Sequence, residues 1–185
     1  MEVLLLQHTS IRISALFVLA ALLVALTATA VVAATVRGTN GDDILTGTPN
    51  ADKIYAKSGA DTARGFNGND IVHGGPGDDL VKGGQNKDSV FGNTGNDTVV
   101  GGTGPDRVGG GTGRDTLEGR GGDDHIAAAG DGQRDRVSCG TGTDVAVVDP
   151  NDLVDDQLVS SVLDLPGQAV GIIGSCERVE VRVFQ

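Results

Sequence analysis

Residues 74–82 read Gly74-Gly75-Pro76-Gly77-Asp78-Asp79-Leu80-Val81-Lys82, and variants of this nine-residue unit fill the middle of the chain. One aspartate of the unit recurs every nine residues over ten unbroken copies. A short fixed period of this kind is typical of a solenoid, in which each repeat buries its apolar side chain against its neighbours. The recurring aspartates are Asp43, Asp52, Asp61, Asp70, Asp79, Asp88, Asp97, Asp106, Asp115 and Asp124.

Two other positions of the unit are equally regular. The residue two places after each aspartate is always apolar, which predicts one inward-facing side chain in each short strand. The residue two places before it is always Gly or Asn, the types that accept a left-handed backbone. The apolar positions are Leu45, Ile54, Ala63, Val72, Val81, Val90, Val99, Val108, Leu117 and Ile126. The Gly or Asn positions are Gly41, Asn50, Gly59, Gly68, Gly77, Asn86, Gly95, Gly104, Gly113 and Gly122.

The aspartates are expected to form two columns. Successive units should lie on opposite sides of a flattened coil, so that each unit stacks on the second one after it. Stacked strands are about 4.8 Å apart, and two carboxylates about 5 Å apart repel by roughly 3 kcal/mol at an effective dielectric of 20. A divalent cation between adjacent turns would reverse that repulsion. The first column runs from Asp43 through Asp61, Asp79 and Asp97 to Asp115, and the second from Asp52 through Asp70, Asp88 and Asp106 to Asp124.

The units Gly74–Lys82 and Gly101–Gly109 resemble the G-G-x-G-x-D-x-U-x unit of hemolysin-type calcium-binding (RTX) repeats. The resemblance covers Gly38–Ala127, about half of the chain. It implies an all-β fold, a parallel β-roll, in which the first six residues of each unit form a calcium-binding turn and the last three a short strand. The implied ligands are the ten aspartates together with the turn backbone at Gly41, Gly59, Gly68, Gly77, Gly95, Gly104, Gly113 and Gly122.

The residue types favour calcium over other metals. Calcium accepts six to eight oxygen ligands in flexible geometry, whereas magnesium prefers strict octahedra and zinc prefers His or Cys. If each ion lies between two stacked turns, five turns at each edge predict about eight calcium ions in all. The alternative is a set of metal-free Asp-rich turns. Units that depart from the pattern, at Asn50, Ala56, Ala63 and Asn86, are expected to bind more weakly.

The N-terminal segment differs from the rest of the chain. An apolar run, Ala15–Leu26, follows Arg12 and precedes the small residues Thr27–Ala34. This order predicts a secretory signal peptide over residues 1–33, cleaved near Ala33 or Ala34. The alternative is an uncleaved membrane anchor, since residues 13–34 are long enough to span a bilayer. Either way, the remaining chain is expected to be secreted or to lie at the cell surface.

The repeat register changes after the predicted roll, residues 34–127. Asp135 follows Asp124 by eleven residues, after which Asp144 restores the nine-residue step. In an exported protein the pair Cys139 and Cys176 predicts a disulfide, the alternative being two unpaired thiols. The C-G-x-G-x-D and C-E-R-V segments at these cysteines resemble the closing segment of secreted calcium-binding repeat proteins. Residues 128–185 are therefore predicted to form degraded repeats and a disulfide-tied cap, with a half-buried strand at residues 179–183.

Composition limits the functional classes. The chain carries 25 acidic and 14 basic residues, a net charge of −11, which argues against nucleic acid as a partner. We find no nucleophile elbow, H-E-x-x-H, phosphate loop or cofactor fingerprint, and therefore predict no enzymatic activity. His73 and His125 flank inward positions and are expected to point to solvent.

The sequence favours an exported calcium-binding protein with a structural, surface or adhesion role, whose folding is coupled to calcium binding. Alternatives are a non-catalytic module related to RTX extracellular hydrolases, a type I secretion passenger, or an ice- or surface-binding β-solenoid. The first alternative is weakened because no room remains for a catalytic domain, and the second because an N-terminal export signal departs from that pattern. No particular protein or cell-surface glycan partner is indicated.

Overall fold

The structure is a computed structural model of the whole chain, and it describes residues 32–155, 157–158 and 175–182. The predicted signal peptide, and with it the alternative of a membrane anchor, lies almost entirely outside these ranges. In the described part, no helix is long and apolar enough to cross a membrane. All regular secondary structure there is β-strand.

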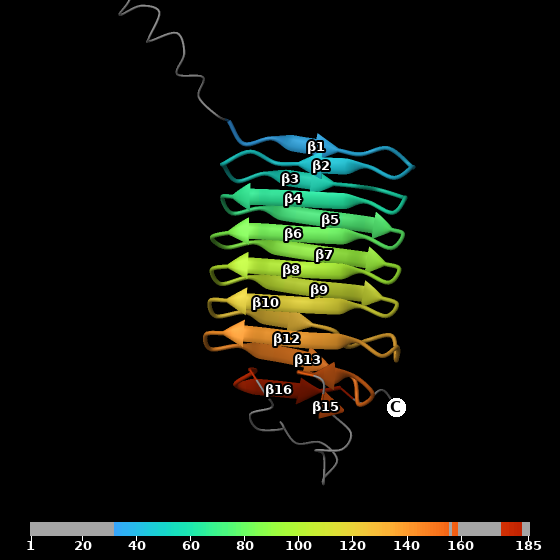
Figure 1. Cartoon of the computed structure of the whole chain (residues 1–185), viewed down its shortest axis with the longest axis vertical. Coiled ribbons are helices and arrows are strands. Elements are labelled where there is room, and N and C mark those ends of the chain that lie inside the picture. The colour runs from blue at the N-terminus through green and yellow to red at the C-terminus, as the bar shows by residue number, and fades with distance from the viewer. Residues whose placement is uncertain (1–31, 156, 159–174, 183–185) are drawn as a thin grey trace, which may run out of the picture. The chain divides into compact units, whose positions relative to one another are not determined.

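Strands β1 to β14 alternate along the chain between two sheets, which form the two faces of a β-roll (Figure 1). One sheet contains β1 (Thr35–Arg37), β3 (Lys53–Tyr55), β5 (Ile71–Pro76), β7 (Ser89–Thr94), β9 (Arg107–Thr112), β11 (His125–Ala127), β13 (Val145–Val148) and β16 (Arg178–Val181). The other contains β2 (Ile44–Thr46), β4 (Thr62–Asn67), β6 (Leu80–Gln85), β8 (Thr98–Thr103), β10 (Thr116–Gly121), β12 (Arg136–Thr141), β14 (Leu153–Val154) and β15 (Gln157–Leu158).

The register confirms two units per coil. Val72 pairs with Val90 and Val81 pairs with Val99, in each case the residue eighteen positions later. Among the described residues, all strand pairs are parallel except β14 with β15. The predicted parallel β-roll is therefore confirmed.

The core is a thin double row of the predicted apolar residues. From β3 to β11, one such side chain in each strand is buried, because neighbouring side chains along a strand point to opposite faces. Leu45 in β2, near the open N-terminal end, is only half-buried. The buried members are Ile54, Ala63, Val72, Val81, Val90, Val99, Val108, Leu117 and Ile126, joined in the C-terminal coils by Val137 and Ala146.

The strands of the regular coils are longer than the three residues that the resemblance implies. Strands β4 to β10, and β12, each span six residues. The extra residues belong to the first half of the following turn, whose backbone stays in register with the turn below: Phe66 pairs with Gly84, and Asn67 with Gln85. The turns therefore stack as closely as the strands.

The outer face of the sheet that contains β3, β5 and β7 carries a stack of rings. Tyr55 and His73 lie with ring centroids 5.4 Å apart, and His73 and Phe91 with centroids 5.1 Å apart. The Arg37 guanidinium lies over the Tyr55 ring. The expectation that both histidines point to solvent is correct for His125, which is exposed, whereas His73 is half-buried between its aromatic neighbours.

The C-terminal coils close the roll. The turn between β11 and β12, residues 128–135, contains the two extra residues that the spacing predicted. The Cys139–Cys176 disulfide is present, and it holds the C-terminal segment against the start of a turn. The predicted strand at residues 179–183 is observed as β16, which pairs with β13. Much of the apolar tail, residues 159–174, lies outside the described ranges.

Candidate metal centre

The predicted aspartates form the two predicted columns, one along each edge of the roll. In each column, Oδ1 of one aspartate accepts a hydrogen bond from the backbone N–H of the aspartate in the preceding turn; Asp70 N to Asp88 Oδ1 is 2.8 Å. The same bond joins Asp43 to Asp61, Asp61 to Asp79, Asp79 to Asp97, Asp97 to Asp115, Asp52 to Asp70, Asp88 to Asp106 and Asp106 to Asp124, at 2.7–2.9 Å. We call each aspartate of a column a rung. In most rungs, one carboxylate oxygen therefore has a structural role.

The other oxygen, Oδ2, is unpaired in most rungs. Within the described residues it is buried and has no hydrogen-bond partner, although a buried, unpaired carboxylate oxygen is costly. These aspartates are at most 4% exposed. The unpaired oxygens belong to Asp61, Asp70, Asp79, Asp88, Asp97, Asp106, Asp115, Asp124, Asp135 and Asp144.

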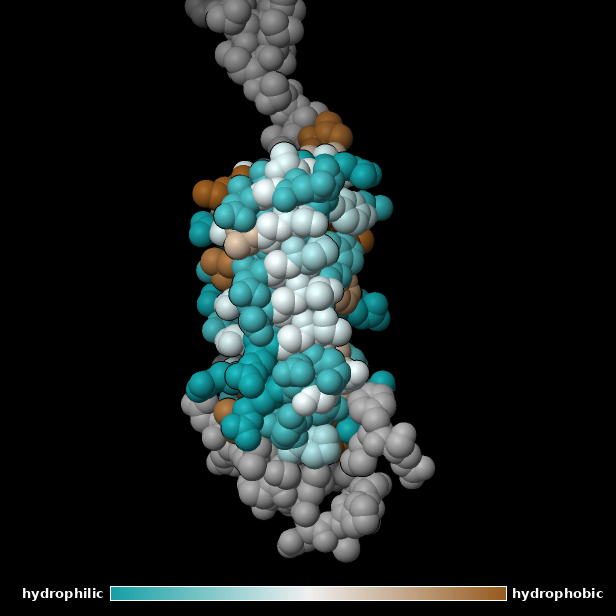
Figure 2. All heavy atoms as spheres, turned by 90° about the vertical axis from the view of Figure 1, so that its right-hand side faces the viewer, coloured by the Kyte–Doolittle hydropathy of each residue, from teal (hydrophilic) through white to brown (hydrophobic). Residues whose placement is uncertain are grey.

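A backbone carbonyl oxygen of the next turn lies near several of these unpaired carboxylate oxygens. A Cβ placed on Gly65 would lie 2.2 Å from Asp70 Oδ2 and 2.6 Å from the carbonyl oxygen of Gly83 in the next turn. A Cβ on Gly84 would lie 2.0 Å from the carbonyl oxygen of Phe66. Glycine thus leaves room in which oxygens of two stacked turns approach one another. Figure 2 shows one turn edge of the roll, where residues of intermediate hydropathy form a column along the axis between hydrophilic side chains.

This donor set fits a hard cation. All its atoms are oxygens, and calcium accepts carboxylate and carbonyl oxygens at flexible geometry. Among the described residues, no group of three or more His, Cys, Asp or Glu side chains converges on one point. A cation would therefore be bound by one or two carboxylates with backbone carbonyls completing its shell.

The carboxyl groups are strongly perturbed without a cation. Burial raises the pKa of Asp88, Asp97 and Asp106 to about 7, aided by neighbouring carboxylates and opposed by the hydrogen bond from the preceding turn. The same causes raise the pKa of Asp135 to about 8. Near neutral pH the metal-free roll thus contains buried carboxyl groups that resist ionisation.

The first two rungs differ from the others. Thr39 donates its N–H and hydroxyl to Asp43 Oδ2, at 2.6 and 2.9 Å, and Thr48 does the same for Asp52. Although burial opposes it, hydrogen bonds from Thr48 and Ala34 lower the pKa of Asp52. Asp43 and Asp52 therefore lack the buried, unpaired oxygen that the other eight predicted ligands have.

The left-handed backbone was predicted at one position of the unit and occurs at two. Gly59, Gly68, Gly77, Asn86, Gly95, Gly104, Gly113 and Gly122 have positive φ, as expected, whereas Gly41 and Asn50 in the first two turns do not. The second residue of the unit is also left-handed, which could not be predicted because residues other than glycine occur at this position. Its members include Lys57, Phe66, Gly75, Gly84, Asn93, Gly102, Gly111 and Arg120.

The columns extend beyond the ten predicted aspartates. Asp135 and Asp144 continue them, accepting the N–H of Asp115 and Asp124 respectively at 2.8 Å. Asp152 then ends one column and Glu177 ends the other. The nine-residue spacing between Asp135 and Asp144 was the sequence signal for these two residues. Nothing in the local sequence marks Glu177 as part of a column.

A second row of side chains, exposed and hydrogen-bonded from turn to turn, was not predicted from the sequence; we call it the outer ladder. The residue before the ladder aspartate is often Asp or Asn, and its side chain accepts the N–H of the equivalent residue in the next turn, as Asp78 does from Asn96 at 2.7 Å. Its solvent exposure distinguishes it from the buried columns. The acceptors are Asp42, Asn69, Asp78, Asn96 and Asp123.

Comparison with known families agrees with this geometry. A model of the RTX calcium-binding nonapeptide repeat matches residues 34–63, 64–99 and 100–132, more than half of the chain. The chain belongs to this family. Calcium binding by RTX repeats is thereby supported for this protein. No curated protein matches the chain.

Proposed function

We propose that this RTX repeat protein is exported and folds as it binds several calcium ions. The observation that supports the proposal most directly is the set of buried, unpaired Oδ2 atoms in the two columns. Several of them, such as Asp70 Oδ2, lie close to a backbone carbonyl oxygen of the next turn, and a calcium ion there would replace an electrostatic cost with coordination bonds.

Calcium binding should be coupled to folding because the other stabilising interactions of the roll are weak. The core contains mostly Val, Ile and Ala and cannot offset many buried carboxylates by itself. Because the turns that hold each site exist only when stacked, the free energy of ion binding contributes directly to folding. About eight ions would occupy the spaces that begin at Asp61, Asp70, Asp79, Asp88, Asp97, Asp106, Asp115 and Asp124.

We further propose a non-catalytic structural or adhesive role outside the cell or at its surface. The repeats and their closing coils occupy nearly all of the described chain, and RTX repeats are typically structural. Calcium concentrations outside cells suit sites with dissociation constants of about 10⁻⁴–10⁻³ M. The signal peptide over residues 1–33 remains a prediction, as does the division at residue 127.

Calcium titration tests the proposal directly. Metal-free protein at pH 8 should lack β-roll circular dichroism and gain it steeply as calcium is added, since each ion joins two turns. Magnesium at equal concentration is the control and should be much less effective. A metal-free protein as ordered as the calcium-bound one would exclude coupled folding.

Substitutions in two rungs should separate ligands from structural aspartates. Asp97→Asn retains an acceptor for the preceding N–H but places an amide nitrogen at the unpaired oxygen. We expect the calcium concentration at the folding midpoint to rise about tenfold, equivalent to about 1.4 kcal/mol. Asp43→Asn is the matched control, because Thr39 already satisfies Asp43 Oδ2, and it should shift the midpoint less than twofold. Equal shifts would contradict the assignment.

A further inference from the structure

The last rung of one aspartate column is a glutamate from the far end of the chain. Glu177 Oε2 accepts the N–H of Asp144 at 2.6 Å, and Asp144 Oδ1 accepts the N–H of Asp124 at 2.8 Å. Glu177 thus takes the place of a ladder aspartate although it lies 33 residues beyond Asp144 and outside the nonapeptide repeats.

Glu177 is positioned by the residues that precede it. The disulfide joins Cys176 to Cys139, and both cysteines are completely buried. Ser175 Oγ accepts the N–H groups of Cys139 and Gly140, both at 3.0 Å, and Ser175 itself donates to Asp155. The segment that supplies the last rung is therefore tied to the turn that it covers.

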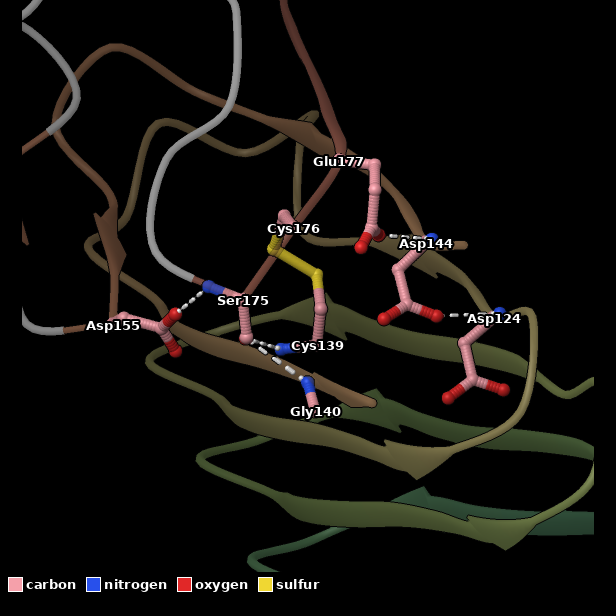
Figure 3. Close-up of a disulfide and its surroundings, with 8 residues drawn as sticks. All are labelled: Asp124, Cys139, Gly140, Asp144, Asp155, Ser175, Cys176 and Glu177. Carbon is pink, nitrogen blue, oxygen red and sulfur yellow. Dashed lines mark hydrogen bonds between the residues drawn. A yellow bond between two sulfur atoms is a disulfide. The ribbon is translucent and has the colours of Figure 1, made fainter. Parts of the chain in front are cut away.

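Asp144 faces this segment with an unsatisfied oxygen. Its side chain is completely buried, and Oδ2 has no hydrogen-bond partner among the described residues. Figure 3 shows that the second oxygens of Asp144 and Glu177 point to the same side, toward the disulfide. In the regular turns the equivalent Oδ2 marks the space between its own turn and the next, here the space between Asp144 and Glu177.

The other column ends differently. Asp152 accepts the N–H of Asp135 with Oδ1 and the N–H of Asp149 with Oδ2, so neither of its oxygens is left without a donor. Glu177 has one further oxygen and is exposed, which leaves room for water in a coordination shell. Of the two terminal carboxylates, only Glu177 is therefore available as a ligand.

We propose that Asp144 and Glu177 form a terminal calcium site, outside the repeats, that depends on the Cys139–Cys176 disulfide. Asp144 Oδ2 and the second oxygen of Glu177 supply the charged ligands, and backbone carbonyls and water complete the shell. This inference rests on the proposed calcium binding of the repeats.

The test is a count of calcium ions bound at saturation by the oxidised full chain and its variants, measured by equilibrium dialysis. Glu177→Gln keeps an acceptor for the Asp144 N–H but loses the charge, and should bind one ion fewer than the unsubstituted protein. Glu180→Gln is the matched control: Glu180 pairs with Arg178 on the same strand, and its variant should bind the full number. The double variant Cys139→Ser, Cys176→Ser should also lose one ion.

Diffraction from crystals soaked in terbium gives a readout that does not depend on how well a variant folds. An anomalous peak between Asp144 and Glu177 is expected, and its absence from a structure with peaks along the columns would overturn the inference. An unchanged count in Glu177→Gln would also overturn it. A protein that binds no calcium at all would instead refute the proposed function of the repeats.

Discussion

Lowering the pH from 8 to 5 should order the metal-free roll without any calcium. Burial raises the pKa of Asp88, Asp97 and Asp106 to about 7 and that of Asp135 to about 8, whereas an aspartate in an unfolded chain has a pKa near 3.9. At pH 5 these groups can be buried as neutral acids. At pH 8 they must either ionise in the interior or remain exposed in an unfolded chain.

The direction of the effect follows from the raised folded-state pKa. The folded state binds protons more tightly, so stability is greatest below about pH 4, where both states are protonated, and falls as the pH rises toward 7–8. Calcium reverses this dependence, because the ion binds the ionised form and protons compete with it. The calcium-bound roll should therefore be most stable at neutral to mildly alkaline pH.

Circular dichroism of dialysed, metal-free protein between pH 4 and pH 9 measures the effect. The double variant Asp88→Asn, Asp106→Asn is neutral at both positions and should retain order to a higher pH than the unsubstituted chain. A metal-free protein that remains unfolded at pH 5, or that is equally ordered at pH 5 and pH 8, would show that buried carboxylates do not control folding.

Gly102→Ala should strongly destabilise the calcium-bound roll. Gly102 has a φ of +132°, and a Cβ there would lie 2.0 Å from the carbonyl oxygen of Gly84 in the preceding turn. Both the backbone strain and the forced separation of two stacked turns contribute, each about 1–3 kcal/mol. Separating the turns would also widen the space in which the cation is expected.

Gly130→Ala is the matched control for this substitution. Gly130 has nearly the same φ, +135°, but a Cβ would meet nothing within 4 Å because the residue lies in the enlarged turn between β11 and β12. Thermal unfolding in saturating calcium should show a decrease in Tm for both variants and a clearly larger one for Gly102→Ala. Equal decreases would mean that φ alone, and not the closeness of the turns, determines the need for glycine.

The nine-residue period predicted the roll and its columns because the fold repeats the same contacts. One apolar side chain per strand, such as Val90, and one aspartate per turn, such as Asp88, determined the stacking and the two edges. The resemblance to RTX repeats then predicted that these aspartates and the turn carbonyls bind calcium. Neither the prediction from the period nor the prediction from the resemblance required knowledge of contacts between distant parts of the sequence.

The features that escaped prediction depend on such contacts. Thr39 and Thr48 donate hydrogen bonds to Oδ2 of Asp43 and Asp52, and the nine-residue pattern does not predict these bonds. His73 lies between aromatic residues eighteen positions away on either side, and each of these was visible separately but not as a stack. Glu177 joins its column only because the disulfide brings a distant segment to it.

The hydrogen bonds along each column all run in one direction. From Asp52 onward, each carboxylate of the columns accepts the N–H of a residue in the turn before it, so a turn added on the N-terminal side finds its acceptor already in place. The coils that end this series, with Asp152 and Glu177, are synthesised last. An emerging polypeptide therefore cannot complete the two columns until Asp152 and Glu177 have been synthesised, and we expect assembly to proceed backwards along the sequence, from the disulfide-linked coils toward Asp43.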